Sequence, residues 1–253
     1  MIGIFDSGSG GLTVLRAIRE RLPSSDMLYF GDIKHAPYGM RSHEDISALT
    51  AEAMQFLATR NARSFVSACN SASASLALSL LDAFSLETDS LVEMVGPTVS
   101  MFRGSDARVV LFATKATVDA GIYQSGFKMI GKQISCIAIP DLAGAIEAGA
   151  AAAEIERIVA DACASVNWDS YDVAILACTH YPLVFDAFRA AIPERVGIFD
   201  PADAVAERVE RTFWPREAGD GKLHFVISQD SDTFRAHVAR MFPNTQYTIE
   251  VLE

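Results

Sequence analysis

Short apolar segments alternate along this chain with longer segments in which apolar residues recur at helical spacing. The apolar segments predict strands at Ile2–Phe5, Met27–Gly31, Ser64–Ala68, Val109–Ala113, Ser135–Ile139, Val173–Ala177 and His224–Ile227. The intervening spacing predicts helices at Leu12–Arg21, Ser42–Arg60, from Ala72, from Val118, from near Asp141, and at Glu154–Ala164, Leu183–Ala191 and Thr233–Phe242, the last element of the chain. Alternation of this kind predicts an α/β fold, with parallel sheets flanked by helices.

Two of the predicted strands end in the same way. Phe65–Cys69 and Ile175–Cys178 are apolar up to an Ala-Cys pair, and small polar residues and a helix follow each of them. Ligands of open α/β sheets bind outside the carboxyl ends of the strands. The repetition suggests two similar lobes facing each other, with one cysteine at the binding edge of each.

Composition narrows the functional classes. The 253 residues have a net charge of −11, which argues against nucleic-acid binding through a broad basic surface. No signal peptide is visible after Met1, and the Ala-rich stretch 148–166 carries charged residues that disfavour a membrane span. None of the four cysteines lies in a Cys-x-x-Cys pair, so no zinc or thioredoxin-type motif is predicted. We therefore expect a cytoplasmic protein with free thiols and no metal site.

The cysteines have a structural and a functional interpretation. A free cysteine is most often a small buried apolar side chain, and this interpretation suits Cys136 in a strand and Cys163 on an Ala-rich helix. Cys69 and Cys178 instead follow strand ends, beside groups that can bind an anion. Their position leaves both interpretations open.

A glycine-rich turn, Asp6-Ser7-Gly8-Ser9-Gly10-Gly11, follows the first strand. Such a turn can present backbone N–H groups to an anion at a helix N-terminus, or it can be only a tight turn. It lacks the Gly-Lys-Ser/Thr ending of a Walker loop, so nucleotide binding is not predicted. Thr114 and Thr117 are, taken singly, ordinary helix-capping residues.

Six motifs together resemble those of the glutamate racemases in the aspartate/glutamate racemase superfamily. They occur in that family's order, cover most of the chain, and are specific only as a set. They are Ile4-Phe5-Asp6-Ser7-Gly8-Ser9-Gly10-Gly11-Leu12-Thr13-Val14-Leu15, Tyr29-Phe30-Gly31-Asp32, Pro37-Tyr38-Gly39, Ala68-Cys69-Asn70-Ser71-Ala72-Ser73-Ala74, Ala113-Thr114-Lys115-Ala116-Thr117 and Cys178-Thr179-His180-Tyr181-Pro182-Leu183.

The resemblance implies an enzyme that interconverts L- and D-glutamate without a cofactor, supplying D-glutamate for peptidoglycan. It implies two similar lobes, each a mostly parallel sheet flanked by helices, with the active site between them. The first lobe would comprise residues 1–95 plus 208–253, and the second residues 96–207. It also implies a small-molecule substrate and a homodimer as a possible assembly, with neither nucleic acid nor membrane as a partner.

The same resemblance assigns roles to individual residues. Cys69 and Cys178 would be the catalytic thiols, with Asp6 assisting the first, His180 assisting the second, and Glu147 beside that histidine. Substrate contacts would come from Asp6, Ser7, Pro37, Tyr38, Gly39, Asn70, Ser71, Thr117 and Thr179.

The chemistry of inversion suits a pair of thiols. Inverting a stereocentre by proton transfer requires a base on one face and an acid on the other, and the reverse reaction exchanges these roles. A thiolate and a thiol fulfil both, and a neighbouring carboxylate or imidazole can relay the proton. Pyridoxal phosphate would require a lysine in a defined site, and nothing in the sequence marks one.

The sequence departs from the family pattern in three places, and the changes ahead of Pro37 bear on substrate choice. Ser71 stands where Thr is usual, Ser9 replaces a more usual Val, and Ile33-Lys34-His35-Ala36 differs ahead of Pro37. These changes remove no proposed catalytic group, and His35 is interpreted as a surface-loop histidine. An aspartate or other acidic amino-acid racemase of the same superfamily and a non-catalytic binding protein on this fold remain alternatives. A thiol hydrolase is less favoured, because no acyl-transfer signature surrounds either cysteine.

Overall fold

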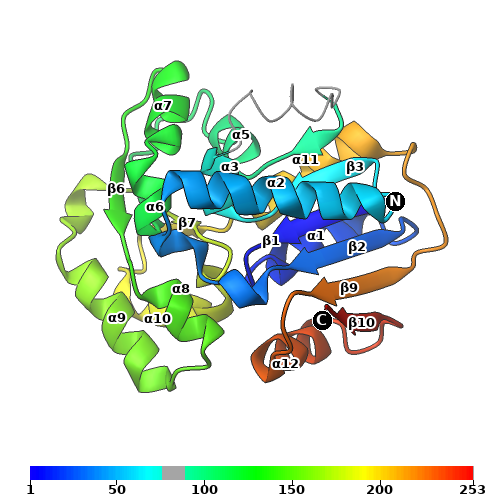
Figure 1. The fold of residues 1–253 in the computed structure, drawn as a ribbon. Coiled ribbons are helices and arrows are strands. Elements are labelled where there is room, and N and C mark those ends of the chain that lie inside the picture. Colours follow the sequence, from blue (N-terminus) through cyan, green and yellow to red (C-terminus); the bar gives the residue numbers. More distant parts are fainter. Residues whose placement is uncertain (76–88, 253) are drawn as a thin grey trace.

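The computed structural model describes residues 1–75 and 89–252, whose strands form two separate parallel sheets (Figure 1). The six-stranded sheet has the order β10 (Thr248–Val251), β9 (Leu223–Ile227), β2 (Met27–Gly31), β1 (Ile2–Asp6), β3 (Ser64–Ser67) and β4 (Leu91–Val92). The four-stranded sheet has the order β6 (Ser135–Ala138), β5 (Val109–Ala113), β7 (Val173–Ala177) and β8 (Gly197–Phe199). We call each sheet with its helices a lobe. The predicted two-lobed α/β architecture is confirmed.

Helices cover both faces of each sheet. In the first lobe these are α1 (Leu12–Arg21), α2 (His43–Thr59), α3 (Asn70–Ser75), α11 (Ala202–Phe213) and α12 (Asp232–Met241). In the second lobe, or between the lobes, lie α5 (Val95–Ser100), α6 (Lys115–Asp119), α7 (Ile122–Met129), α8 (Leu142–Glu147), α9 (Ala152–Ala164) and α10 (Phe185–Ala191). Short 3-10 turns occupy η1 (Ile33–His35), η2 (Tyr38–Met40), η3 (Trp168–Ser170) and η4 (Tyr181–Val184).

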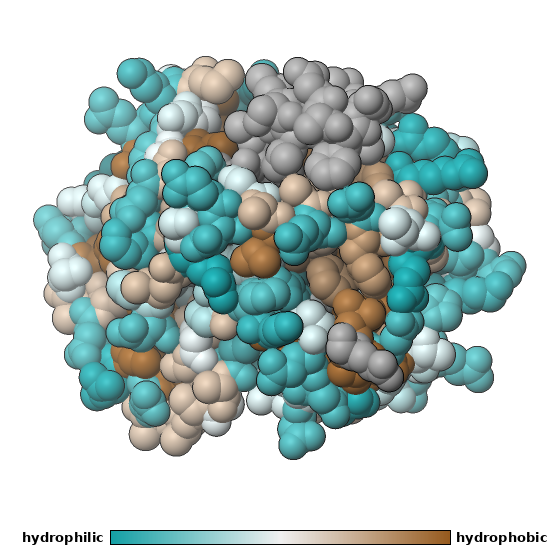
Figure 2. Space-filling model, viewed as in Figure 1, coloured by the Kyte–Doolittle hydropathy of each residue, from teal (hydrophilic) through white to brown (hydrophobic). Residues whose placement is uncertain are grey.

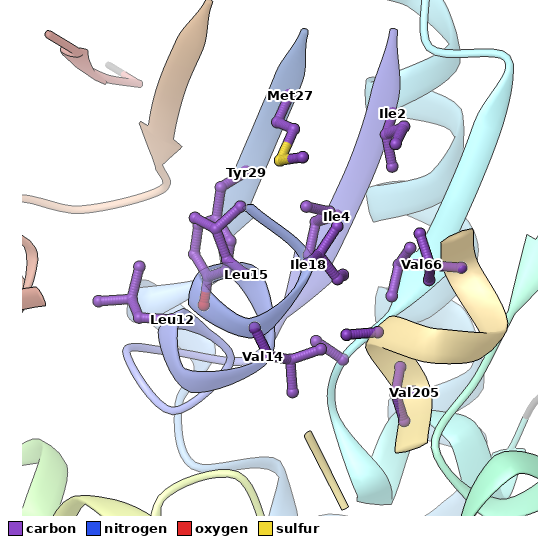
Figure 3. Close-up of a cluster of buried hydrophobic side chains, with 14 of the residues drawn as sticks. Ile2, Ile4, Leu12, Val14, Leu15, Ile18, Met27, Tyr29, Val66 and Val205 are labelled. Carbon is purple, nitrogen blue, oxygen red and sulfur yellow. The ribbon is translucent and has the colours of Figure 1, made fainter. Parts of the chain in front are cut away.

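Side-chain alternation along β1 explains why its sheet is covered on both faces. Ile2 and Ile4 join one buried apolar cluster with residues of α1 and α11 (Figure 3). Phe5 points to the other face and joins a second buried cluster with residues of α2. Successive strand residues face opposite sides of a sheet, so a strand between two helical layers is apolar throughout. The uniformly apolar runs of the sequence have this physical origin.

The structure departs from the predicted elements in several places. Strands β4 and β8 and helices α5 and α11 have no counterpart among the predicted elements. The prediction that helix 233–242 ends the fold is wrong, because β10 follows it and pairs in parallel with β9. Two short helices, α6 and α7, replace the single helix predicted from Val118, since Gly121 adopts a positive φ of 66° between them. The helix predicted from Ala72 begins two residues earlier, and its continuation lies outside the described residues.

The chain crosses between the lobes more than once. After β8 it returns to the first lobe, where α11 packs against α1. A division at residues 95 and 208 stays a prediction.

Figure 2 shows a face on which hydrophilic residues predominate and apolar ones lie scattered among them. Within the described part of the chain, no helix combines the length and apolar character needed to cross a bilayer.

Candidate active site

The carboxyl ends of the two sheets meet around a small buried cavity. Its volume is about 10 Å³, room for about one water molecule. Both Cys69 and Cys178 line it, each just beyond the end of its strand. The described residues that line it are Ser7, Pro37, Tyr38, Gly39, Cys69, Asn70, Ser71, Thr114, Ala143, Cys178, Thr179 and His180.

Three of the residues predicted from the sequence lie behind this lining. Asp6 is fully buried at the end of β1, and its carboxylate accepts hydrogen bonds from the Gly8 N–H at 2.9 Å and the Thr179 hydroxyl at 3.1 Å. Glu147 contacts His180, and Thr117 lies 3.3 Å from Ser71 between the hydroxyl oxygens. The structure therefore brings together every residue that the sequence indicated.

The Cys69 side of the cavity contains a buried acid, Asp6. The Cys69 thiol lies 3.6 Å from the Ser7 hydroxyl and 3.5 Å from the Ala72 amide. Burial raises the pKa of Cys69 to about 12, and the nearby charge of Asp6 adds to the effect. Burial also raises the pKa of Asp6. The geometry thus favours a protonated thiol at Cys69.

The Cys178 side holds a buried ion pair instead. Nδ1 of His180 lies 3.9 Å from the Cys178 sulfur, and its Nε2 lies 2.6 Å from Oε2 of Glu147. Burial alone lowers the pKa of His180, but hydrogen bonds with Cys178 and Glu147 and their charges raise it well above 6.5. Burial opposes the ionisation of Glu147, yet bonds from His180 and Ser9 leave the pKa of that carboxylate lowered. An imidazolium therefore lies beside the Cys178 sulfur.

A cluster of hydroxyl groups joins the lobes across the cavity. Ser71 of α3 lies 2.9 Å from Thr114 of the second lobe, which in turn lies 3.0 Å from Thr117 between hydroxyl oxygens. Thr114 also caps α6, because its hydroxyl accepts from the Thr117 amide. Hydroxyls arranged in this way can donate to a carboxylate.

Asn70 presents an unused donor. Its side-chain oxygen accepts a 2.6 Å hydrogen bond from the Tyr123 hydroxyl, while its amide nitrogen is buried with no partner among the described residues. A buried donor left unpaired carries a free-energy cost, which a bound acceptor would remove. Asn70 therefore suits an anionic or carbonyl ligand.

The loop before Tyr38 is tied to Asp32. This buried carboxylate accepts hydrogen bonds at 2.7 Å from the hydroxyls of Tyr38 and Ser228, and lies 2.9 Å from Nδ1 of His35. His35, predicted to be a surface-loop residue, is about one-third exposed and pairs with Asp32. The altered sequence ahead of Pro37 thus still holds the loop against the cavity.

Two glycines of the turn after β1 permit the lobes to meet. A Cβ atom on Gly8 would lie 2.6 Å from Glu147, and one on Gly10 would lie 2.6 Å from His180. Any larger residue would separate the two lobes here. The turn is needed for this close approach, which its sequence alone did not distinguish from a simple tight turn.

Four residues of the site were not predicted to act there. The sequence indicates Thr114 only as a helix cap and Ser9 only as a departure from the family pattern. Tyr123 and His237 carried no signal, because each contacts the site through another residue from a distant part of the chain. Among residues 1–75 and 89–252, no three His, Cys, Asp or Glu side chains are grouped closely enough to hold a metal ion.

Comparison with known proteins identifies what this arrangement is similar to. The family model described as Asp/Glu/Hydantoin racemase matches residues 2–209. Glutamate racemase 3 of Caldanaerobacter subterraneus subsp. tengcongensis is 36% identical, over 92% of this chain and 87% of its own length. A glutamate racemase of Ruegeria sp. is 34% identical, over 98% of this chain and 98% of its own length. The crystal structure of the glutamate racemase isoform RacE1 from Bacillus anthracis superposes with a TM-score of 0.87 at 25% identity, covering 100% of this chain and 97% of that one.

Proposed function

Because this chain belongs to the Asp/Glu/Hydantoin racemase family, we propose that it interconverts L- and D-glutamate by proton transfer between two thiols. One observation above all supports this proposal. Cys69 and Cys178, from different lobes, line the same cavity of about 10 Å³. The charge on Cys178 contributes to the raised pKa of Cys69, as expected of thiols that face each other.

The reaction requires one thiolate and one thiol at a time. The thiolate takes the α-proton from one face of the substrate, and its S–H bond forms as the C–H bond breaks. The electron pair left on the α-carbon then takes a proton from the opposite thiol, which becomes the new thiolate. The amino acid leaves with inverted configuration, and the two cysteines have exchanged protonation states. The protein requires no cofactor for this balance.

The neighbours of each thiol determine the starting state. Burial and Asp6 favour a thiol at Cys69, and the His180 imidazolium lies beside the Cys178 sulfur. We propose that His180 and Glu147 serve the Cys178 side and Asp6 the Cys69 side. On each side these groups can return a proton to the thiol.

The remaining polar groups suit a substrate with two carboxylates and an ammonium group. We propose that Ser7, Asn70, Ser71, Thr117 and Thr179 hold the carboxylates through hydroxyl and amide donors, with Asp6 near the ammonium group. Pro37, Tyr38 and Gly39 would close the same side of the site. The Asn70 amide nitrogen, buried without a partner among the described residues, supports this assignment.

The cavity is too small for glutamate as it stands. A space of about 10 Å³ holds about one water molecule, so the lobes must separate for the substrate to enter. Closure around the substrate would then exclude water and strengthen every polar interaction at the α-carbon.

Exchange in heavy water tests the activity and its specificity. Purified protein is incubated with single L- and D-amino acids without added cofactor, and α-deuteration and optical rotation are followed. We expect exchange and inversion with glutamate. Exchange with aspartate alone would change the substrate, and no exchange with any amino acid would refute the racemase proposal.

The activity has a cellular context that follows from its product. We propose that the D-glutamate serves peptidoglycan synthesis and that the enzyme works in the cytoplasm, where thiols remain reduced. We also propose a homodimer, which sedimentation of the purified protein would test.

A further inference from the structure

Ser9 connects the buried ion pair of the second lobe to helix α12 of the first. Its amide and its hydroxyl both lie 2.9 Å from Oε2 of Glu147, the same oxygen that contacts His180. On its other side, the Ser9 hydroxyl lies 3.0 Å from Nδ1 of His237. Ser9 is fully buried, so solvent cannot replace these bonds.

The direction of each hydrogen bond follows from the donors available. Glu147 is ionised in the pair with His180 and can only accept, so the single Ser9 hydroxyl proton points to it. Toward His237 the Ser9 oxygen must therefore accept, and His237 must carry its proton on Nδ1. The order of donation is His237 to Ser9 and Ser9 to Glu147. Each donor in such a chain strengthens the next one.

Glu147 depends on this series of hydrogen bonds because its other carboxylate oxygen, Oε1, does not help to hold the side chain in place. Oε1 is buried and has no hydrogen-bond partner among the described residues. The orientation of the carboxylate, and hence its hold on His180, rests on donors to Oε2. Two of the three come from Ser9.

The surroundings of His237 favour a neutral imidazole that donates a hydrogen bond. Burial lowers the pKa of His237, and Arg240 on the same helix lowers it further; Glu147 acts in the opposite direction and His180 in the same. His237 also opens onto a surface hollow of about 430 Å³, into which Glu156 of α9, Asp186 of α10 and Arg240 project. At neutral pH a neutral imidazole with its proton on Nδ1 satisfies Ser9.

We propose that His237 is a positioning residue for the reaction, acting through Ser9 to hold Glu147 as the charged partner of His180. This inference rests on the proposed function, since it concerns the Cys178 half of that mechanism. His237 touches no reacting atom. It extends the catalytic site from the cavity to helix α12, which the sequence motifs do not include.

Substitutions of the two donors in this series of hydrogen bonds, Ser9 and His237, test the inference. Ser9→Ala removes one donor to Glu147 and is expected to lower kcat/KM roughly 10-fold, within the range for one lost hydrogen bond to a charged group. His237→Phe removes only the hydrogen bond from His237 to Ser9, so we expect kcat/KM to fall about 5-fold. The double variant should match Ser9→Ala alone, because His237 acts only through Ser9. Independent, multiplying losses would overturn the inference.

The pH profile separates positioning from packing. Glu147 with fewer donors should protonate more readily, so the acid limb of kcat/KM should move to higher pH in both variants. His237→Asn keeps an N–H at the position of Nδ1 and should restore rate and profile to within about twofold of wild type. An Asn variant as impaired as the Phe variant would overturn the inference, as would losses without any shift of the limb.

His224 offers a matched control. Its Nδ1 lies 2.7 Å from the Thr248 hydroxyl, the same kind of contact on strand β9, away from the cavity. His224→Phe should leave both the rate and the pH profile unchanged. A loss of rate equal to that of His237→Phe would mean that both effects come from general disturbance of this lobe, and it would overturn the inference.

A measurement without substrate distinguishes failure of this inference from failure of the proposed function. Proton NMR of the free protein follows the His180 imidazole through a pH titration. His237→Phe should shift the pKa that this titration gives for the His180 imidazole, while His237→Asn and His224→Phe should not. No shift with His237→Phe overturns the inference, whatever the activity. Absence of amino-acid exchange in wild type would refute the function instead.

Discussion

The two thiols occupy equivalent places at the ends of parallel strands, yet opposite kinds of groups surround them. Cys69 has a buried acid and one hydroxyl nearby, and burial raises its pKa to about 12. Cys178 has an imidazole at 3.9 Å, which a carboxylate holds from behind. Two similar strand ends thus place their cysteines beside side chains of different charge.

The difference shows how a near-symmetric reaction can start from an asymmetric protein. Inversion needs one thiol and one thiolate, and identical surroundings would leave both cysteines with the same preference. Placing the imidazolium on one side favours a single starting arrangement. The price is that the two directions of the reaction do not use equivalent states of the enzyme.

Removing either thiol should have the largest effect. Cys69→Ala and Cys178→Ala are each expected to lower inversion roughly 10⁴-fold, the upper range for general acid–base groups. Each variant keeps one thiol, so each should still exchange the α-proton of one enantiomer only, and the two should prefer opposite enantiomers. Chiral chromatography with mass spectrometry in heavy water measures both quantities.

Cys136 provides the control for this experiment. It lies in strand β6, is half-buried, and is absent from the cavity lining. Cys136→Ala should keep full activity. Inversion by Cys69→Ala or Cys178→Ala at more than a few per cent of the wild-type rate would contradict the two-thiol proposal.

Neutralising the assistants should sharpen the comparison between the two sides. His180→Asn removes the positive charge beside Cys178 and is expected to lower kcat about 100-fold, at the lower end for general acid–base groups. Asp6→Asn keeps the shape of the side chain but removes the charge that acts on Cys69. It should lower kcat roughly 10-fold, the effect of about one pKa unit.

Enantiomers have equal free energies, so kcat/KM must be the same in both directions for every variant. The separate kcat values can differ. We expect the two variants to slow opposite directions more strongly, measured by initial rates from L- and D-glutamate. Equal changes in both directions for both variants would argue against the assignment of one assistant to each thiol.

The pH dependence should be broad. The pKa of His180 is raised above 6.5, so the imidazolium persists at higher pH and activity should hold well past pH 6.5 before it falls. The pKa of Glu147 is lowered from 4.5, so activity should hold below that pH until the carboxylate takes up a proton. Initial rates across pH, with recovery tested at neutral pH, measure both limbs. A fall of activity centred on pH 6.5 would contradict the charged pair.

The sequence was sufficient for the two-lobed α/β architecture and for most of the cavity lining, but not for β4, β8, α5 and α11 or for the place of Thr114 in that lining. Uniformly apolar strands predicted buried parallel sheets, and the ordered motifs placed Cys69, Cys178 and their neighbours at one edge. Strand β10 escaped prediction because its residues alternate between exposed and half-buried at the edge of the sheet. A short edge strand lacks the apolar run that marks a central one.

The outer layer of the site could not be predicted for a different reason. Tyr123 and His237 reach the cavity only through Asn70 and Ser9, 53 and 228 positions away along the chain. No periodicity or local motif records a contact between residues so distant in sequence. Folding brings Tyr123 of the second lobe to Asn70 of the first, and it brings His237 of α12 to Ser9 within the first lobe.

The smallest expected effect lies in this outer layer and concerns binding. The Tyr123 hydroxyl donates to the Asn70 oxygen and so turns the amide nitrogen of Asn70 toward an acceptor. Tyr123→Phe removes one neutral hydrogen bond and should raise KM for glutamate about 5-fold, with kcat little changed. Tyr171→Phe, which loses only an exposed bond to Ser135, is the matched control. A loss in kcat without a change in KM would show that Asn70 serves the proton transfer and not the carboxylate, and would move it to the catalytic side of the comparison.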